Sequence, residues 1–246
     1  MNLQGRVVWV VGASSGIGAA SARELLARGA TVAVSARREP ALEKVSGGRM
    51  LVVPLDVTDA ASVKAAAMRV RDEHGRIDVA ILAAGYWKQV DVQAWDTDDL
   101  NRHLQVNLTG MSNAIAAVLP ELLERRSGTI AGISSVAGFR GLAGAEAYGA
   151  TKAAQINLLE SLRVHVAKSG VRITTICPGF VRTELTASNE FPMPFLIDAE
   201  QAAASICDGL EHDRTEIVFP LPMALLMKAA RLVPVGLWTR IWARAA

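Results

Sequence analysis

The sequence predicts a single α/β domain in which helices flank both faces of a seven-stranded parallel sheet, the doubly wound arrangement. Short β-branched runs alternate with longer Ala- and Leu-rich segments of helical period from residue 7 to about residue 219, and no Ser/Gly linker or low-complexity segment interrupts them. Strands that are apolar on both faces suit a buried parallel sheet. The expected strands are Val7–Val11, Thr31–Ser35, Met50–Val53, Val79–Ala83, Gly128–Ile133, Val171–Cys177 and Glu216–Phe219.

The segments between these strands predict helices. Gly29, Gly75 and Gly170 stand where helix C-caps are expected, because glycine adopts the left-handed backbone conformation with little strain. Residues 184–198 hold a Pro-interrupted apolar stretch that we expect to form no regular element. Residues 1–219 are expected to form the binding and catalytic domain, and residues 220–246 an apolar and basic extension of it. The expected helices lie near Ser15–Arg28, Ala60–His74, Asp98–Glu124, Ala147–Ser169 and Ala199–Glu211.

Composition excludes several classes of protein. With 246 residues, 51% hydrophobic and 20% charged, the chain is neither disordered nor a disulfide scaffold, and a net charge of +2 gives no basis for a nucleic-acid partner. Cys177 and Cys207 form no metal or redox motif, which favours a reducing, cytoplasmic setting. The N-terminus leads into Val7–Val11 without a charged leader and predicts a strand, not a signal peptide. The apolar run Ile217–Met227 is too short to span a bilayer.

A glycine-rich turn joins the first expected strand to the first expected helix. Its glycines have the spacing G-x-x-x-G-x-G. Such glycines permit a tight turn and let the backbone N–H groups of the helix N-terminus approach a pyrophosphate. The alternative is a glycine-rich turn that only caps the helix. The position of the motif between a strand and a helix favours phosphate binding over this alternative. The residues expected at the phosphates are Gly12, Ser14, Ser15, Gly16, Ile17 and Gly18.

The end of the second strand predicts which dinucleotide is bound. A NAD-binding unit carries an acid there that bonds the ribose 2′-OH, whereas this chain has Ala36 followed by Arg37 and Arg38. Two guanidinium groups suit a 2′-phosphate, so the pattern favours NADP(H). The alternative, that both arginines are solvated loop charges, stays open. Asp56 and Val57, directly after the third strand, are expected at the edge of the adenine ring.

A Tyr-x-x-x-Lys pair supplies candidate acid–base chemistry. Tyr148 and Lys152 fall one turn apart at the start of an expected helix. A nearby ammonium stabilises a phenolate, which is the pKa change that a proton-transferring tyrosine requires. Ser134 and Ser135 follow the fifth strand, at the carboxyl edge of the sheet where ligands bind, and a hydroxyl there can polarise a substrate carbonyl.

With these motifs in this order, the chain resembles the short-chain dehydrogenase/reductase family over residues 5 to 219, which implies a Rossmann-type fold. The resemblance implies that Ser135 orients the substrate, that Tyr148 is the acid/base, and that Lys152 anchors the ribose and lowers the tyrosine pKa. It also implies that Asn107 holds a water that links the lysine to solvent. Members are frequently dimers or tetramers, so a homo-oligomer is expected.

The resemblance extends to the segments around the nicotinamide, with two departures. Pro178, Gly179, Val181 and Thr183 match the segment that contacts this ring, with Val181 and Thr183 facing the carboxamide. The family's usual Asn-Asn-Ala-Gly is here Leu82-Ala83-Ala84-Gly85, and its usual Thr before the first glycine is Val11. Both changes put loop stability in doubt more than chemistry. Ala84 and Gly85 are kept beside the expected cofactor.

The segments that line the family's substrate pocket are apolar in this chain. They predict a lipophilic ketone or alcohol, such as a 3-oxoacyl or steroid-like compound, although several of these side chains could instead close a lid against the core. Arg140 is the one obvious nearby charge and receives no role. The pocket residues expected from the sequence are Tyr86, Trp87, Phe139, Leu142, Phe191, Met193, Phe195 and Leu196.

The tail past Glu216 contains no acidic residue and carries Lys228, Arg231, Arg240 and Arg244. On an ideal helix Trp238, Ile241 and Trp242 share one face, and Arg240 and Arg244 share another. Three roles are open: surface association with an anionic membrane, packing on a second subunit, or cover for the substrate lid.

Two other functions are weighed against an NADP(H)-dependent oxidoreductase. A non-catalytic NADP(H) sensor would use the same fold but need not keep Asn107, Ser135, Tyr148 and Lys152 together. A serine esterase is suggested by G-x-S-x-G around Ser14, with Asp198 and His212 as formal triad partners, yet only one strand precedes Ser14. No metal is expected, because His74, His103, His165 and His212 lack ligand spacing.

Overall fold

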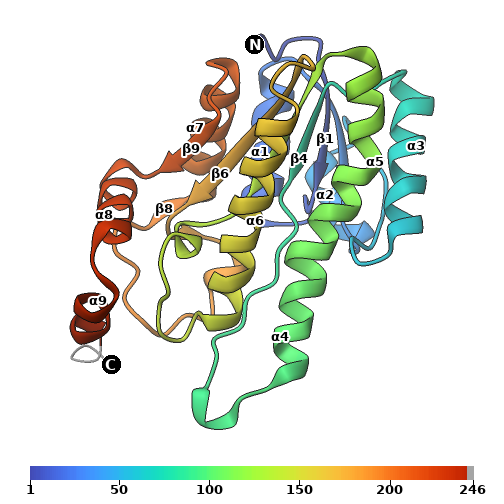
Figure 1. The fold of residues 1–246 in the computed structure, drawn as a ribbon. Coiled ribbons are helices and arrows are strands. Elements are labelled where there is room, and N and C mark those ends of the chain that lie inside the picture. The colour runs from blue at the N-terminus through green and yellow to red at the C-terminus, as the bar shows by residue number, and fades with distance from the viewer. Residues whose placement is uncertain (243–246) are drawn as a thin grey trace.

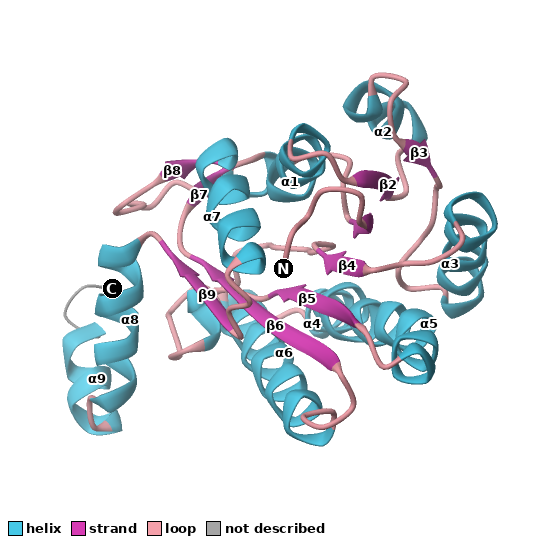
Figure 2. Ribbon diagram, turned by 90° about the horizontal axis from the view of Figure 1, so that it is seen from above, coloured by secondary structure: helices cyan, strands magenta, loops and turns pink. Residues whose placement is uncertain are grey.

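A computed structural model describes residues 1–242 and shows a seven-stranded parallel sheet between two layers of helices (Figures 1 and 2). The strand order is β3-β2-β1-β4-β5-β6-β9, which confirms the predicted doubly wound fold. The order reverses between β1 and β4, and ligands bind at such a switch point, outside the carboxyl ends of the strands. The strands are β1 Val7–Val11, β2 Thr31–Ser35, β3 Leu51–Val52, β4 Val79–Leu82, β5 Gly128–Ile133, β6 Val171–Pro178 and β9 Glu216–Phe219.

The alternation of side chains along each strand builds two cores. In β1, Val8 and Val10 point into a core beneath α1 (Gly16–Ala27) and α7 (Ala199–Glu211). Val7, Trp9 and Val11 point into the opposite core, with α3 (Ala60–His74), α5 (Gly110–Arg125) and α6 (Glu146–His165). Figure 2 shows these helices on the two sides of the sheet. Because both faces of every central strand are covered, the sheet is rigid and holds its carboxyl edge in place.

The helix ends follow from local chemistry. Asp59 caps α3 by accepting a hydrogen bond from the backbone N–H of Ala61 at 2.9 Å. Gly75 ends α3 in the left-handed conformation, with φ at 80°. Gly29 directly follows the C-cap of α1 with φ at 81°, as its position predicted. Gly170 has φ at 84°, but α6 ends at His165 with Val166 as its C-cap, so the predicted cap at Gly170 was wrong.

One predicted helix is not continuous. The expected segment Asp98–Glu124 consists of α4 (Thr97–His103), a π-helical turn at Leu104–Thr109, and α5. The N–H of Gly110 bonds the carbonyl of Gln105, five residues back, and the side chain of Gln155 donates to the carbonyl of Asn107 at 2.5 Å. The Asn107 carbonyl accepts this hydrogen bond from a side chain of α6, which disturbs the regular hydrogen bonds of the α-helix. The helix therefore widens into a π-helical turn at Asn107.

Three further segments differ from the sequence prediction. Helix α2 (Glu39–Ser46) follows β2, where no helix was expected. Within residues 184–198, the expectation of no regular element was wrong at the ends, because a 3₁₀ turn forms at Glu184–Thr186 and β8 (Ile197–Asp198) pairs with β7 (Val181–Arg182). The tail folds into α8 (Leu221–Leu232) and α9 (Val235–Trp242).

Figure 1 places α8 and α9 at the outer edge of the sheet, beyond β9. Met223 and Met227 of α8 bury their side chains against Phe139 and Cys177. Within residues 1–242, none of the helices has the length and hydropathy needed to cross a membrane. The predicted tail cation Arg244 and the side chain of Trp242 lie outside the described part of the chain.

Candidate active site

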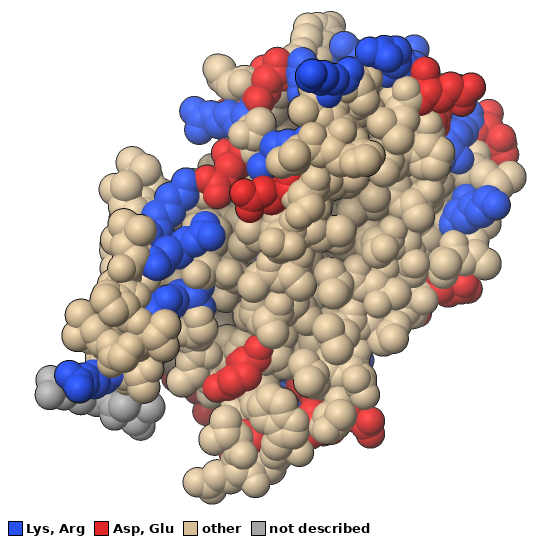
Figure 3. Space-filling model, in the orientation of Figure 1, with Lys and Arg blue, Asp and Glu red and all other residues tan. Residues whose placement is uncertain are grey.

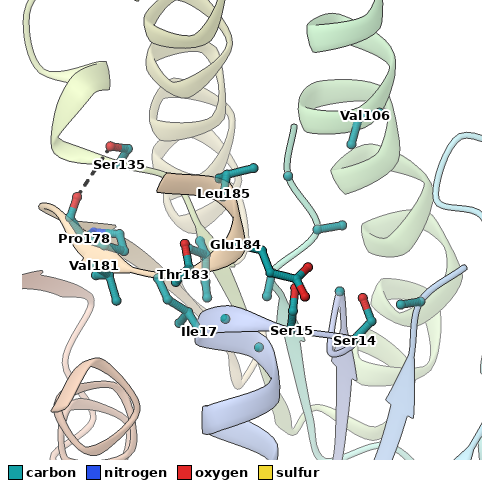
Figure 4. A pocket seen from close by; sticks show the side chains of 18 of the residues that line it. Ser14, Ser15, Ile17, Val106, Ser135, Pro178, Val181, Thr183, Glu184 and Leu185 are labelled. Carbon is teal, nitrogen blue, oxygen red and sulfur yellow. Dashed lines mark hydrogen bonds between the residues drawn. The ribbon is translucent and has the colours of Figure 1, made fainter. Parts of the chain in front are cut away.

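A cavity of about 440 Å³ opens at the carboxyl edge of the sheet, at the switch point between β1 and β4. Figure 4 shows side chains from α1, the turn after β6 and the π-helical turn around it. All residues predicted for the cofactor except Asp56 line this cavity, and Ser135 joins them. Lining residues that were not predicted to bind the cofactor are Ala36, Leu55, Ala83, Val106, Ile133, Ser134, Glu184, Leu185 and Thr186.

Asp56 instead ties its own turn together. Its Oδ1 accepts hydrogen bonds from the backbone N–H of Thr58 at 2.9 Å and from the Thr58 hydroxyl at 2.8 Å. The backbone bond from Thr58 and the charge of Arg37 lower the pKa of the Asp56 carboxyl, against the effect of partial burial. Val57, the neighbour of Asp56, lines the cavity.

The glycine turn is shaped to receive a dinucleotide. A Cβ on Gly12 would lie 2.3 Å from the backbone nitrogen of Ala84, and one on Gly18 would lie 2.2 Å from the carbonyl oxygen of Gly12. Gly12 also has φ at 91°, which side chains disfavour. At the N-terminus of α1, no side chain caps the helix and no acid occupies its first turn. The positive end of the helix is therefore available to a pyrophosphate, so these residues fit the cofactor.

Arg38 and Glu184 form an ion pair across the mouth of the cavity. Arg38 Nη2 lies 2.7 Å from Glu184 Oε2 and 3.3 Å from both the Ser14 and Ser15 hydroxyls. Figure 4 shows the Glu184 carboxylate next to Ser15. Hydrogen bonds from Arg38 and Ser15 lower the pKa of Glu184. Glu184 was not predicted for the site, although its position directly after Thr183, in a segment assigned to the nicotinamide, was a usable signal.

Helix α6 brings Tyr148 and Lys152 together beneath this cavity. The Lys152 Nζ lies 5.3 Å from the centre of the Tyr148 ring and donates to the carbonyl of Ile133 at 3.1 Å. Burial lowers the pKa of Lys152 to about 7. Burial also raises the pKa of Tyr148 to about 12, and a hydrogen bond with Ser135 opposes this rise. The tyrosine is therefore protonated at neutral pH and is a proton donor whose phenolate needs a stabilising cation.

Ser135 stands at the end of β5, facing the tyrosine. Its Oγ accepts from the backbone N–H of Ala137 at 3.1 Å and caps the short turn Val136–Gly138. The same hydroxyl contacts the carbonyl oxygen of Pro178 at 3.5 Å, drawn as a dashed line in Figure 4. The neighbouring Ser134 is buried and donates to the carbonyl of Lys152 at 2.8 Å. Ser135 is thus the hydroxyl that faces the cavity beside Tyr148, and Ser134 fixes α6 against β5.

Asn107 occupies the π-helical turn and is fully buried. Its side-chain amide bonds both backbone groups of Tyr86, at 2.7 and 3.0 Å, and donates to the Thr151 hydroxyl at 3.0 Å. Thr151 directly precedes Lys152 on α6. Asn107 therefore joins the segment after β4 to the helix that carries Tyr148 and Lys152, and its role in holding a water stays a prediction.

Aromatic rings surround the Tyr148 side chain. Trp87 packs edge-on against Tyr148 with ring centres 5.2 Å apart, and Phe191 packs edge-on against Trp87 at 6.5 Å. The Trp87 indole donates to Asn189, whose amide contacts the sulfur of Met193 at 3.4 Å. Trp87 and Phe191 thus pack in succession beside the tyrosine, and the Asn189 amide links Trp87 to Met193.

Tyr86 belongs to a polar cluster next to this one. Its hydroxyl donates to Asp99 at 2.7 Å, and its ring packs edge-on against His103. The guanidinium of Arg102 covers the same ring, 4.4 Å from its centre. Asp99 and His103 were not predicted for the site, because they lie on a helix in a stretch without a recognisable motif.

Three residues predicted for the substrate pocket lie elsewhere. Phe139 packs in the hydrophobic cluster beneath α8, with Leu142 against the same cluster. Both line a separate cavity over α6. Phe195 is 48% exposed, at a left-handed turn with φ at 59°. Their positions follow from the fold of the tail, which covers Phe139 and which the sequence pattern did not specify.

The esterase alternative is wrong for this structure. Ser14 lies in the phosphate-binding turn, beside Arg38. Asp198 bonds Arg182 at 3.0 Å and caps α7, whereas His212 ends α7 with Nδ1 bonded to the carbonyl of Asp208. The two formal triad partners are therefore committed to opposite ends of one helix.

The fold and the site define an oxidoreductase with a dinucleotide cleft. The family model described as short chain dehydrogenase matches residues 6–192. The chain is 37% identical over 235 residues to an uncharacterized oxidoreductase of Myxococcus xanthus, covering 93% of both chains. A short-chain dehydrogenase structure from Streptomyces avermitilis superposes with a TM-score of 0.85, at 29% identity and 98% coverage of both chains. A short-chain dehydrogenase from Sphingobium yanoikuyae, in complex with NADPH, gives 0.81 at 26% identity and 92% coverage of both chains.

The chain belongs to the short-chain dehydrogenase/reductase family, as its motifs predicted. It is an oxidoreductase that binds a nicotinamide cofactor, the property that the family shares.

Proposed function

We propose that the chain is an NADP(H)-dependent oxidoreductase that reduces the carbonyl group of an apolar ketone and, in reverse, oxidises the alcohol. The observation that carries the choice of NADP(H) is the end of β2, where Ala36, Arg37 and Arg38 line the dinucleotide cavity. A 2′-phosphate there meets two guanidinium groups and no carboxylate from the strand end.

NADP(H), when bound, supplies the hydride acceptor or donor of the reaction. The chain's own residues bind and orient the reactants. The N-terminus of α1 and the turn Gly12–Gly18 hold the phosphates, and the Ser135 hydroxyl donates a hydrogen bond to the substrate carbonyl oxygen, which polarises the carbon.

Proton transfer belongs to Tyr148. Its hydroxyl, with a pKa raised to about 12 by burial, donates a proton to the developing alkoxide oxygen of the substrate. The Lys152 ammonium, 5.3 Å from the ring centre, stabilises the phenolate that remains. Burial lowers the pKa of Lys152 to about 7. The phenolate is therefore stabilised in those protein molecules whose Lys152 is protonated.

The substrate class follows from the side chains at Tyr148. The rings of Trp87 and Phe191 pack in succession beside its ring, and an apolar ketone buries its carbon chain against them. A charged substrate would have to lose its hydration against the same rings, which disfavours it.

The choice of cofactor is tested by fluorescence titration with NADPH and NADH. NADPH is expected to bind roughly tenfold or more tightly, because charge-assisted bonds to the 2′-phosphate add to the shared contacts. Arg37→Gln should weaken NADPH binding and leave NADH binding unchanged. Arg69→Gln is the matched control, since Arg69 is an exposed arginine on α3, paired with Glu73. Equal affinity for both nucleotides would overturn the assignment of NADP(H).

The substrate class is tested by following NADPH oxidation over a series of ketones with increasing chain length. The rate at low substrate concentration should rise with chain length, and Trp87→Ala should remove this dependence. A preference for short or charged carbonyl compounds would contradict an apolar pocket.

A further inference from the structure

The solvent-facing side of α8 is apolar. Leu221, Leu225 and Leu232 are 69%, 63% and 86% exposed, and Leu226 is 54% exposed. On the opposite side of the helix, Met223, Ala224, Met227 and Ala230 are buried against the body of the protein. An amphipathic helix that packs on a core normally turns polar or charged residues toward solvent. Helix α8 differs, because it exposes leucines on the side that faces away from the core.

Helix α9 continues this surface. Val235, Leu237 and Ile241 are 71%, 52% and 49% exposed. Trp238 points the other way, because its indole donates to the carbonyl of Gly141 at 2.8 Å. The prediction that Trp238 and Ile241 share one face was therefore wrong. Trp238 faces the body of the protein, whereas Ile241 faces solvent. We call Leu221, Leu225, Leu226, Leu232, Val235, Leu237 and Ile241 the tail apolar surface.

The tail is fixed to the body of the protein. Arg140 donates to the carbonyl of Val233, between α8 and α9, at 2.9 Å, and its guanidinium lies 5.5 Å from the centre of the Trp238 ring. Together with the bond from Trp238 to Gly141, these contacts hold both helices against the segment after Ser135. The tail apolar surface is thus presented by an ordered pair of helices.

The described part of the tail carries only positive charges of its own. The sequence past Glu216 holds Lys228, Arg231 and Arg240 in its described part and no acidic residue. Lys228 pairs with Glu216 and remains 49% exposed, and Arg231 lies over the Phe139 ring at 5.3 Å from its centre. Figure 3 shows the edge formed by α8 and α9 as uncharged surface with Lys and Arg side chains beside it.

We propose that the tail apolar surface docks the protein on a lipid bilayer that carries anionic headgroups. Exposed leucines enter the boundary between headgroups and acyl chains, while cations at their margin meet phosphate groups. A second copy of the chain fits less well. A two-fold contact through this surface would place each tail's cations opposite those of its partner, with no carboxylate past Glu216 to oppose them.

The test is flotation of the full chain with vesicles of phosphatidylcholine alone, or of phosphatidylcholine with phosphatidylglycerol. Binding to the anionic vesicles is expected to exceed binding to the neutral ones several-fold and to fall as salt is added. Leu225→Ser with Leu232→Ser should lower binding by about tenfold or more, since both side chains are the part that enters the bilayer. Lys228→Gln with Arg240→Gln should lower it by about fivefold per cation lost.

Val164→Ser is the matched control, because Val164 is 74% exposed on α6, away from the tail. It should bind vesicles as the unchanged chain does, and all variants should keep their affinity for NADPH, which reports an intact fold. Equal flotation with neutral and anionic vesicles would overturn the proposal, as would no flotation at all. A concentration-dependent dimer that Leu225→Ser with Leu232→Ser dissociates, without vesicle binding, would assign the surface to a second copy instead.

Discussion

Replacing Lys152 by Met should make the protein more stable at neutral pH while removing its activity. Burial lowers the pKa of Lys152 from 10.5 to about 7 in the folded chain. The unfolded chain therefore holds more protons than the folded chain between these two values, and stability rises with pH across this window. At pH 7 the burial of this lysine costs about 4 kcal/mol of folding free energy, because a tenfold change in a proton-binding constant corresponds to about 1.4 kcal/mol.

Methionine carries no such cost but loses the hydrogen bond from Lys152 to the carbonyl of Ile133. That loss is about 1 to 2 kcal/mol, so Lys152→Met should gain about 2 to 3 kcal/mol at pH 7. The gain in stability should vanish near pH 10, because Lys152 in the folded unchanged protein is then largely neutral, as methionine is in the variant.

The assay is equilibrium unfolding in urea at several pH values for both proteins. The difference in unfolding free energy should shrink by about 3 kcal/mol between pH 7 and pH 10. If the unfolding free energies of the two proteins changed with pH in parallel, the pKa of Lys152 would not be lowered by burial. That result would refute the electrostatic account of the site.

Two other substitutions test the 2′-phosphate site. Glu184→Gln frees Arg38 from its 2.7 Å ion pair, in which both side chains are more than half exposed, so NADPH affinity should rise about 1.5- to 5-fold with NADH affinity unchanged. Fluorescence titration measures both, and an equal change for the two nucleotides would contradict competition at Arg38. Ala36→Asp should repel the 2′-phosphate and shift preference toward NADH, and unchanged Michaelis constants for both nucleotides would remove Arg37 and the end of β2 from the account.

Short-range patterns were sufficient to predict the sheet and the phosphate turn. The runs of β-branched residues in β1 and β6 are long enough to identify strands, and Gly12 and Gly18 each stand where a Cβ would collide with backbone. The Tyr148–Lys152 spacing likewise needs nothing beyond one turn of helix. These features depend on residues that are neighbours in sequence or on one element.

What the sequence did not predict depends on contacts between distant residues. The helix around Asn107 widens because Gln155, 48 residues later, takes a carbonyl from it. Glu184 reaches Arg38 across 146 positions, so their ion pair forms only because the fold brings the end of β2 and the turn after β7 together. Phe139 was predicted for the pocket because nothing in the sequence showed that α8 would cover it. A homo-oligomer and a cytoplasmic location stay predictions.

The most direct test of the central claim compares the unchanged chain with Tyr148→Phe, using an apolar ketone that the unchanged chain reduces. Phenylalanine keeps the ring that packs against Trp87 and removes the hydroxyl that transfers the proton. NADPH oxidation should fall by about 10²- to 10⁴-fold, while the affinity for NADPH measured by fluorescence stays the same. Near-normal turnover by Tyr148→Phe would contradict proton transfer by this tyrosine.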